Sequence, residues 1–273
     1  MQSKKNNYVR HDQYYTKPDT AKKCIASIKT ILSFSDYDII LEPSAGTGAF
    51  YTLLPPDLRV GIDIEPKCDG VIQTDFLQTE PLSGKVLTIG NPPFGVQSKL
   101  AVKFFNYAAV FSSEIAFIVP AVWRKWSIHR KLDKKFSLVK NYKIPYNSFT
   151  HNNCDYNVNC VFQLWTCSMC KKDMRIKQAP ITTHPDFSFL ANSKKNQADF
   201  LMVVCGARRE LIHEINSTVS RWTVERIKIH VKGVREIFEA INWHKYSNTG
   251  TGTMWINRAT IVKEYVRKKF QTI

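Results

Sequence analysis

The chain has 273 residues, of which 44% are apolar and 23% charged, so it can bury one sizeable core and carry a smaller appended part. Seven cysteines, the lack of an apolar leader and apolar runs far shorter than the ~18 residues of a membrane span argue against a disulfide scaffold, a secretory signal and a transmembrane protein. We therefore expect a soluble intracellular protein. The net charge of +16 favours a polyanionic partner, and residues 171–273 hold 19 Lys and Arg against 9 Asp and Glu.

The first predicted helix follows Tyr15, Thr16 and Pro18. Thr16 is a candidate cap, Pro18 suits the first turn, and apolar residues recur at helical spacing as far as Leu32. A buried strand at 38–41 then runs into a turn of small residues, which reads Glu42-Pro43-Ser44-Ala45-Gly46-Thr47-Gly48. This turn is expected to lead into a helix that Pro55 and Pro56 end quickly.

The small-residue turn differs from the dinucleotide fingerprint G-x-G-x-x-G, because Tyr51 stands at the third glycine position. Two glycines still admit a ligand close to the backbone, so a nucleoside without a diphosphate fits better. Asp63 ends the next strand, where a carboxylate can accept both hydroxyls of a ribose. Asp75 and Phe76 follow a third strand and suit an adenine amino group and its ring face. For each acid, a helix cap or a turn is an equally weighted alternative.

Asn91-Pro92-Pro93-Phe94 follows a buried strand at 86–90. The prolines lack N–H donors and stiffen the loop, so its carbonyls and the Asn91 amide make a rigid pair of acceptors beside an aromatic face. Such a pair suits an exocyclic amine on a planar ring, whose two N–H groups need two acceptors and whose face needs a stacking partner. The alternative is a plain proline turn after a strand.

Further alternation of helix and strand predicts a doubly wound parallel sheet. The later elements of this sheet are a helix at 100–109 and strands at 114–120, 138–146 and 158–166. The intervening run 123–143, which includes Arg124 and Lys125, carries a dense positive charge beside the proposed site. Phosphate contact and a solvated helix face are equally weighted for this run. Phe149 stands in a polar loop, and an exposed ring there is a candidate second stacking face.

Four cysteines at 154, 160, 167 and 170 raise the question of a zinc site. A strand between Cys160 and Cys167 would hold those thiols roughly 20 Å apart at ~3.3 Å per residue, which disfavours shared metal ligation. Residues 171–195 look like an irregular linker, and 248–253 like a mobile loop.

The last part of the chain is expected to be a small basic α+β extension. It combines a strand at 200–205, an alternating strand at 225–232 and a basic helix at 257–270. The alternating strand places Ile227, Ile229 and Val231 on an apolar face, and Arg226, Lys228, His230 and Lys232 on a cationic face. A cationic face of this kind is a candidate clamp for nucleic acid.

Together, these motifs resemble those of class I S-adenosylmethionine-dependent methyltransferases, most closely the adenine-N6 enzymes that carry an NPPF or NPPY motif. The resemblance implies a Rossmann-like, seven-stranded α/β methyltransferase domain over residues 1–170, followed by the basic extension at 171–273. It also implies S-adenosyl-L-methionine as cofactor and the N6 amino group of adenine in nucleic acid as methyl acceptor, with DNA slightly favoured over RNA. No comparable match covers residues 171–273, and the oligomeric state is left open.

The resemblance also implies roles for individual residues. The implied catalytic residues are Asn91, Pro92, Phe94 and Phe149. The implied cofactor-binding residues are Tyr15, Thr16, Glu42, Pro43, Ala45, Gly46, Gly48, Asp63, Ile64, Asp75, Phe76 and Asn91. Charge alone adds the substrate-binding candidates Arg124, Lys125, Arg226, Lys228 and Lys232, and no metal ligand is expected.

Two other functions remain open at this point. A protein glutamine N5-methyltransferase would present a side-chain amide NH2 to the same motif, although the basic C-terminal part favours nucleic acid. A catalytically inactive, nucleic-acid-binding subunit with a methyltransferase fold is the second alternative. The intact Gly46, Gly48, Asp63, Asp75 and Asn91 argue against it.

Overall fold

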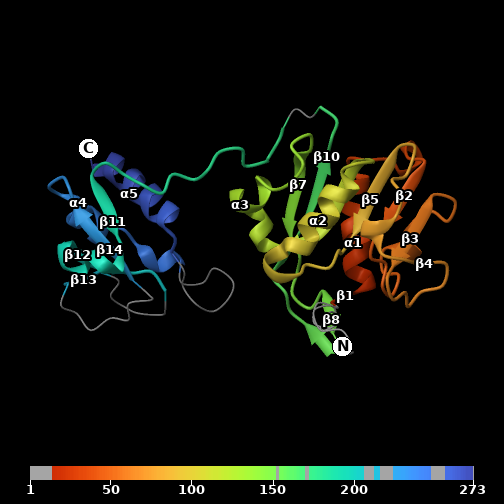
Figure 1. Ribbon diagram of the computed structural model, residues 1–273, viewed down its shortest axis with the longest axis horizontal. Helices are drawn as coiled ribbons and strands as arrows, with labels where there is room; N and C mark the ends of the chain where they lie inside the picture. Colours follow the sequence, from red (N-terminus) through yellow and green to blue (C-terminus); the bar gives the residue numbers. More distant parts are fainter. Residues whose placement is uncertain are drawn as a thin grey trace, which may run out of the picture. The chain divides into compact units, whose positions relative to one another are not determined.

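The computed structural model describes residues 14–151, 154–169, 172–205, 212–215, 224–246 and 256–272. It divides the chain into two compact units, Met1–Gln178 and Ala179–Ile273 (Figure 1). The first unit holds a seven-stranded and a three-stranded sheet, and the second holds a four-stranded sheet. Cys170 and the predicted loop at 248–253 lie outside the described residues.

The seven-stranded sheet has the order β4-β3-β2-β5-β6-β10-β7. Its strands are β2 (Ile39–Glu42), β3 (Arg59–Asp63), β4 (Ile72–Gln73), β5 (Val86–Gly90), β6 (Ser112–Pro120), β7 (Ser137–Lys143) and β10 (Cys160–Thr166). All neighbours pair in parallel except β10, which runs antiparallel to both β6 and β7. The predicted Rossmann-like, seven-stranded α/β class is therefore confirmed, whereas the expectation of an all-parallel sheet is wrong at β10.

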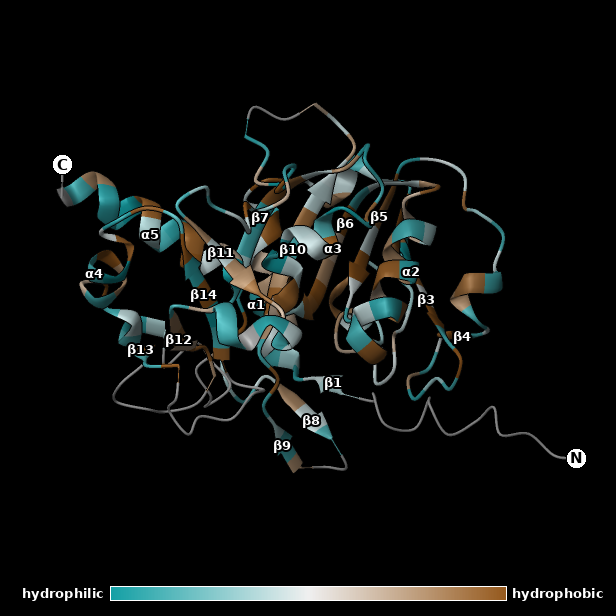
Figure 2. Cartoon of the chain, turned by 60° about the vertical axis from the view of Figure 1, so that its left-hand side comes forward, coloured by the Kyte–Doolittle hydropathy of each residue, from teal (hydrophilic) through white to brown (hydrophobic). Residues whose placement is uncertain are grey.

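Every residue of β5 and β10 is buried, as expected of inner strands, and their sequences are mainly apolar apart from Thr88, Gln163 and Thr166 (Figure 2). Helices α1 (Pro18–Lys29) and α2 (Lys99–Ala108) cover opposite faces of the sheet. Phe105 of α2 packs against Trp165 of β10. Lys140 of β7 donates from Nζ to the Ser27 carbonyl of α1, 2.7 Å away. Lys140 pairs with Leu164 across the β10–β7 ladder and shares its face, whereas the adjacent Trp165 points to the other face. Helices therefore cover both faces, and the sheet is doubly wound.

The start of α1 differs from the sequence expectation. Lys17, and not Thr16, occupies the N-cap position, and no side chain caps the helix. Thr16 instead belongs to β1 (Tyr15–Thr16), which pairs with β8 (Phe149–His151). Pro18 stands at the first helical position, where its missing N–H costs nothing.

The expected helix after the small-residue turn does not form. Residues 43–50 are turns, and only a short 3-10 helix, Tyr51–Leu53, precedes the two prolines. Gly46 and Gly48 have φ values of 50° and 81°, in the left-handed region that helices do not use. Pro55 and Pro56 then leave too few residues for a helix to develop.

A small three-stranded sheet of order β1-β8-β9 corrects the prediction for Phe149. Phe149 is 1% exposed and packs into the main core, so it is no exposed stacking face. It pairs with Thr16 on β1 and with Tyr156 on β9 (Cys154–Tyr156). Phe149 thus turns inward although Tyr156, its partner across the ladder, is 41% exposed.

Residues 172–178 belong by their contacts to the first unit, which ends eight residues after the boundary expected from sequence. Arg175 donates from its two terminal nitrogens to four carbonyls, at 2.6 to 2.8 Å. The acceptors are the carbonyls of His129, Leu132, Asp133 and Phe136. One guanidinium therefore satisfies the carbonyls at the end of helix α3 (Trp126–His129) and in the turns after it.

The second unit is an antiparallel sheet of order β11-β14-β12-β13 with two helices. The elements are β11 (Phe187–Leu190), β12 (Phe200–Val203), β13 (Ile212–His213), β14 (Val224–Ile229), α4 (Val234–Glu239) and α5 (Arg258–Thr272). Its core includes Phe187, Phe200, Ile227, Phe238 and Tyr265. Strand β14 ends at Ile229, so Val231 is 48% exposed and does not join the apolar face as expected.

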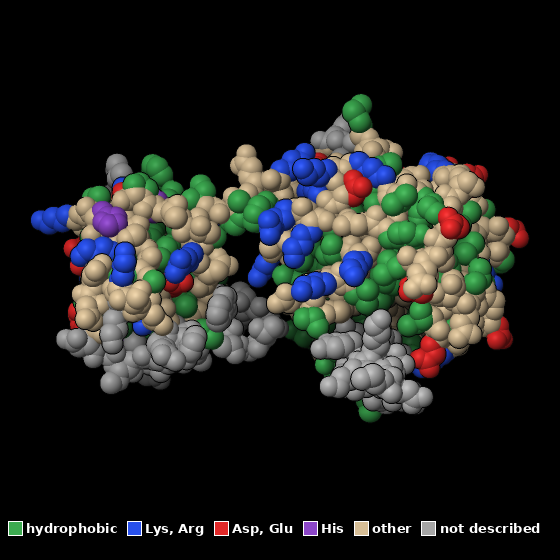
Figure 3. All heavy atoms as spheres, in the orientation of Figure 1, with side chains coloured by type: hydrophobic (Ala, Val, Ile, Leu, Met, Phe, Trp, Pro, Cys, Tyr) green, Lys and Arg blue, Asp and Glu red, His purple; other side chains and the backbone are tan. Residues whose placement is uncertain are grey.

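In Figure 3, Lys and Arg side chains gather on the part of the first unit formed by α3 and its neighbours. Asp and Glu side chains are more frequent toward β3 and β4. Among the described helices, none combines the length and the apolar character required to cross a membrane.

Candidate active site

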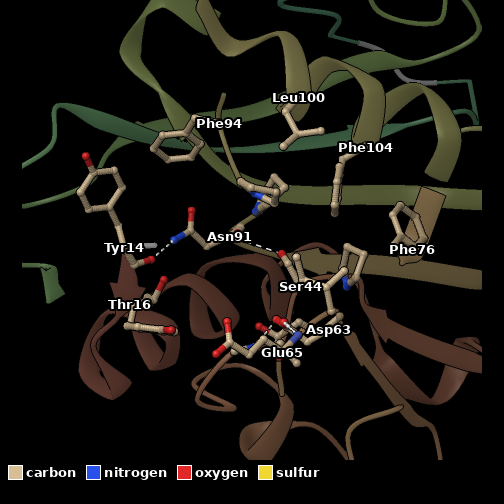
Figure 4. Close-up of a pocket in the computed structure, with 18 of the residues that line it drawn as sticks. Tyr14, Thr16, Ser44, Asp63, Glu65, Phe76, Asn91, Phe94, Leu100 and Phe104 are labelled. Atoms are coloured by element: carbon tan, nitrogen blue, oxygen red, sulfur yellow. Dashed lines mark hydrogen bonds between the residues drawn. The ribbon is translucent and has the colours of Figure 1, made fainter. Parts of the chain in front are cut away.

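A pocket of about 400 Å³ opens at the carboxyl ends of β2, β3 and β5 (Figure 4). Strand β2 lies between β3 and β5: the chain continues from β2 to β3 and β4 on one side, and then crosses over to β5 on the other side. Open α/β sheets bind ligands at such a switch point, because the loops on either side diverge and leave a crevice. The topology thus places the pocket where the sequence motifs were expected to converge.

The structure brings most of the predicted site residues to this one pocket. Those that line it are Tyr15, Thr16, Glu42, Pro43, Ala45, Gly46, Asp63, Ile64, Asp75, Phe76, Asn91, Pro92 and Phe94. Gly48 and Phe149 are not among the lining residues. A Cβ on Gly48 would lie 2.5 Å from the Cys68 sulfur, so glycine is required there for packing and not for ligand approach.

Asp63 holds the glycine turn in place. Its Oδ2 accepts from the Gly46 N–H at 2.7 Å, and its Oδ1 accepts from the Glu65 N–H at 2.8 Å. A Cβ on Gly46 would lie 3.1 Å from the Tyr15 ring, and the φ of 50° disfavours any side chain there. Backbone is therefore exposed to the pocket at Gly46, and Asp63 fixes its position from the neighbouring strand.

Asp75 has the capping geometry that was weighed as the alternative to ligand contact. Its Oδ1 accepts from the Leu77 N–H at 3.0 Å, and its Oδ2 accepts from Gln78 Nε2 at 3.2 Å. Phe76 is 1% exposed, and its ring lies 5.1 Å from the Phe104 ring, centroid to centroid. Both carboxylate oxygens thus already accept hydrogen bonds from the turn that follows Asp75. The pocket wall next to this turn is aromatic.

Asn91 has the nitrogen of its side-chain amide hydrogen-bonded, whereas the oxygen is unpaired within the described residues. The side-chain Nδ2 donates to the Tyr14 backbone carbonyl at 3.0 Å. The backbone carbonyl of Asn91 accepts from Ser44 Oγ at 3.1 Å. Asn91 Oδ1 is buried and has no hydrogen-bond partner within the described part of the chain. Figure 4 shows this oxygen turned toward the side of the pocket where the rings of Tyr14 and Phe94 stand. The anchor fixes which atom of the amide faces the pocket.

Some lining residues were missed by the sequence analysis, namely Tyr14, Ser44, Glu65, Leu100 and Phe104. Tyr14 precedes the first predicted motif by one residue, and its place depends on the pairing of β1 with the distant β8. Leu100 and Phe104 are four residues apart on α2, within the helix predicted at 100–109. That spacing is the signal for a shared helix face, but it cannot tell a core wall from a pocket wall.

The positively charged candidates lie outside the pocket. Arg124 and Lys125 follow β6, the parallel neighbour of β5, so they start from the same edge of the sheet as Asn91. Arg124 donates from Nε to Asn141 Oδ1 at 3.4 Å. In the described ranges, neither Arg124 nor Lys125 has an ion-pair partner. Arg226, Lys228 and Lys232 belong to the second unit. Of these, Lys228 already pairs with Asp199 at 3.0 Å.

Glu42 is a buried acid in the wall of the pocket. It is 2% exposed, and its Oε2 accepts from the Tyr51 N–H at 2.7 Å. Burial raises the pKa of Glu42 well above its ordinary value, an effect that the Tyr51 N–H opposes and the nearby Asp63 reinforces. The acid is therefore held in its neutral form over a wider pH range than an exposed glutamate.

This raised pKa predicts that Glu42 lowers folding stability as the pH rises. The unfolded chain releases the Glu42 proton near the ordinary pKa of 4.5, whereas the folded chain retains it. Stability from this group is fully present below that value and is lost toward the folded pKa, by about 1.4 kcal/mol per pH unit. Glu42→Gln keeps the acceptor for Tyr51 without a titrating proton. In urea unfolding at several pH values, the free energy of unfolding of Glu42→Gln should rise relative to that of the wild type as the pH increases. Parallel pH profiles of the two proteins would contradict this prediction.

No family model and no curated protein match the chain. Several solved structures resemble it. A Pyrococcus horikoshii protein described as an RNA methyltransferase is 18% identical, over 61% of this chain and 92% of that one, with a TM-score of 0.46. A Listeria monocytogenes protein described as a class I S-adenosylmethionine-dependent methyltransferase is 14% identical, over 60% and 64%, with a TM-score of 0.44. The magnesium protoporphyrin IX methyltransferase of Synechocystis, solved with bound S-adenosylmethionine, is 12% identical, over 55% and 79%, with a TM-score of 0.41.

Proposed function

We propose that the chain is an S-adenosylmethionine-dependent methyltransferase that methylates the N6 amino group of adenine in nucleic acid. The observation that carries this proposal is Asn91 Oδ1, a buried acceptor with no partner in the described residues, held at the mouth of a nucleoside-sized pocket. A buried acceptor left unpaired costs about 1–3 kcal/mol, so the site gains by receiving a donor from a ligand.

An aromatic amine supplies the matching donors. Its nitrogen lone pair is delocalised into the ring, and it becomes nucleophilic when its two protons are drawn out of the ring plane. Asn91 Oδ1 accepts a hydrogen bond from one N–H of the amine, and the Pro92 carbonyl accepts one from the other N–H. The Asn91 Nδ2 bond to Tyr14 prevents the amide from turning its own donor toward the amine. The rings of Tyr14 and Phe94 border the same space and offer faces for a planar base.

The residues of the pocket fit the cofactor. Gly46 leaves room for a ligand to approach the backbone, because no side chain can stand there. Thr16 Oγ1 is a second buried polar atom that has no partner in the described residues, and it lines the same wall as Glu42. Asp63 faces the pocket from the end of β3, where it can accept from ribose hydroxyls with the lone pairs that Gly46 and Glu65 leave unused.

Phe76, Leu100 and Phe104 form an apolar wall against which an adenine ring can lie. When bound, S-adenosylmethionine supplies a methyl group on a positively charged sulfur. The chain positions the acceptor amine with Asn91 and Pro92, excludes water with its aromatic walls, and needs no covalent intermediate on the protein.

Methyl transfer is tested by incubating the full chain with labelled S-adenosylmethionine and separate pools of DNA, RNA and protein. Mass spectrometry of the digested pools then identifies the modified unit. N6-methyladenine would support the proposal and would also tell DNA from RNA. N5-methylglutamine would favour the protein substrate instead. No label in any pool, together with no binding of the cofactor by calorimetry, would point to an inactive nucleic-acid-binding subunit.

Nucleic acid as the partner is also a proposal for the second unit. Arg226 and Lys232 have no ion-pair partner in the described residues, whereas Lys228 is paired with Asp199. If the unpaired cations contact phosphates, replacing both with Ala should make the salt dependence of oligonucleotide binding shallower by about 0.7–0.9 units per contact. Lys228→Ala is the matched control and should change the slope less. The salt slopes are measured by fluorescence anisotropy for the wild type, the double variant and Lys228→Ala. Equal slopes for all three would mean that this face contacts solvent and not phosphates.

A further inference from the structure

Aromatic rings stand on the small β1-β8-β9 sheet beside the pocket. Tyr14 and Tyr156 are stacked, with ring centroids 4.7 Å apart and an interplanar angle of 16°. Tyr14 also lines the pocket, whereas Tyr156 is 41% exposed. Tyr146, on the loop that leads into β8, is 67% exposed. Exposed rings of this size, on a hairpin that the chemistry above does not use, need another explanation.

A separate groove of about 450 Å³ begins one residue further along the chain, since Thr16 lines the pocket and Lys17 lines the groove. It lies between the start of α1 and the loop 145–148, and Lys17, Lys23 and Tyr146 are among its lining residues. Lys143 Nζ lies 5.1 Å from the centroid of the Tyr146 ring. In the described residues, Lys23 and Lys143 have no ion-pair partner, and Lys17 pairs only with the exposed Asp155. The exposed Tyr146 ring thus stands among lysines, with Asp19 as an acid in the same lining.

The hairpin and the groove are tied together by the backbone. Lys17 donates its N–H to the Ser148 carbonyl at 3.0 Å, and Asn147 donates its N–H to Asn157 Oδ1 at 2.6 Å. Tyr156 faces Phe149 across the β8–β9 ladder. The loop that carries Tyr146 is thus fixed to α1 on one side and to the hairpin on the other, so the rings and cations are held ready before any partner binds.

We propose that this edge, defined by Tyr146, Tyr156, Lys17, Lys23 and Lys143, binds an unpaired nucleic-acid strand next to the target nucleotide. Unpaired bases offer free ring faces to Tyr146 and Tyr156, whereas the bases of a duplex are already stacked on one another. The lysines face the phosphates that such a strand carries. The inference rests on the proposed function for its target nucleotide, and it adds that the substrate is single-stranded where it meets the enzyme.

The test measures binding without cofactor, so it does not depend on methyl transfer. Labelled single strands of DNA and of RNA, and the same sequence as a duplex, are titrated with the full chain. Tyr146→Ala and Tyr156→Ala should weaken single-strand binding by about 5- to 150-fold each, as loss of one stacked base predicts. Tyr146→Phe and Tyr156→Phe should retain it. Phe270→Ala is the matched control, because this ring is 75% exposed on the second unit.

A lysine pair isolates the charge contribution. Lys22 and Lys23 are both exposed on α1, but only Lys23 lines the groove. Lys23→Ala should make the salt slope for single strands shallower by about 0.7, and Lys22→Ala should leave it unchanged. Unchanged melting temperatures would exclude loss of fold.

Wild-type affinity for both tyrosine-to-alanine variants would overturn the proposal. So would a loss that Phe270→Ala reproduces, or a preference of the wild type for duplex. Strong single-strand binding that depends on Tyr146 and Tyr156, without any methylation of the bound strand, would support the proposal and count against the proposed reaction alone.

Discussion

Asn91→Ala should reduce methyl transfer by at least about 10²–10³-fold, the usual cost of losing a preorganised acceptor or donor at a reacting group. Cofactor affinity should stay nearly the same, because the Asn91 side chain contacts Tyr14 and the open side of the pocket. The measurement combines single-turnover rates on the acceptor found by mass spectrometry with cofactor titration by calorimetry.

The matched control for Asn91 is Ser44→Ala. Ser44 Oγ donates to the Asn91 backbone carbonyl, so its loss should disturb the motif without removing the side-chain acceptor. We expect a much smaller fall in rate than for Asn91→Ala. An Asn91→Ala protein that lost cofactor binding but transferred methyl normally at saturating cofactor would refute the assignment.

Asp63→Ala should show the opposite pattern and weaken cofactor binding first. Its carboxylate accepts from the Gly46 and Glu65 N–H groups, so alanine removes the support of the glycine turn as well as any contact with a ribose. Losing these hydrogen bonds costs about 0.5–3 kcal/mol, which corresponds to a rise of about 2- to 150-fold in the cofactor dissociation constant.

Asp63→Asn separates the two roles of the carboxylate. The asparagine retains one acceptor oxygen and can keep the bond to Gly46, but it replaces the other acceptor with a donor. Its cofactor affinity should therefore fall between those of the wild type and Asp63→Ala. An Asp63→Ala protein with wild-type affinity would remove this residue from the cofactor site.

The sequence predicted the parts of the site that follow directly from strand ends. Asp63 and Asn91 come after short apolar runs, and the carboxyl ends of neighbouring parallel strands meet at one edge. Local chemistry therefore sufficed to bring the glycine turn, Asp63 and Asn91 together. The same logic placed Asp75 at the edge, but it could not decide between capping and binding, since one carboxylate suits both.

The parts that were missed depend on pairing between distant segments. Phe149 follows a polar stretch and was expected to be exposed, but its pairing with Thr16 turns it into the core. The same pairing brings Tyr14 beside Asn91, 77 residues further along the chain. Register of this kind depends on which strand finds which partner, and a one-residue shift would exchange the buried and exposed faces.

Arg175 sets a limit on how the chain can be shortened. A fragment that stops at residue 170, the boundary that the family resemblance implied, would lack the guanidinium that joins four carbonyls around the end of α3. It would also lack Ile176, whose N–H donates to His129 Nδ1, and Asp173, which accepts from the Leu138 N–H at the edge strand β7. Five acceptors and one strand donor would then lose partners at once. A fragment of the first unit that keeps these contacts therefore extends at least to Ile176, and the compact unit itself ends at Gln178.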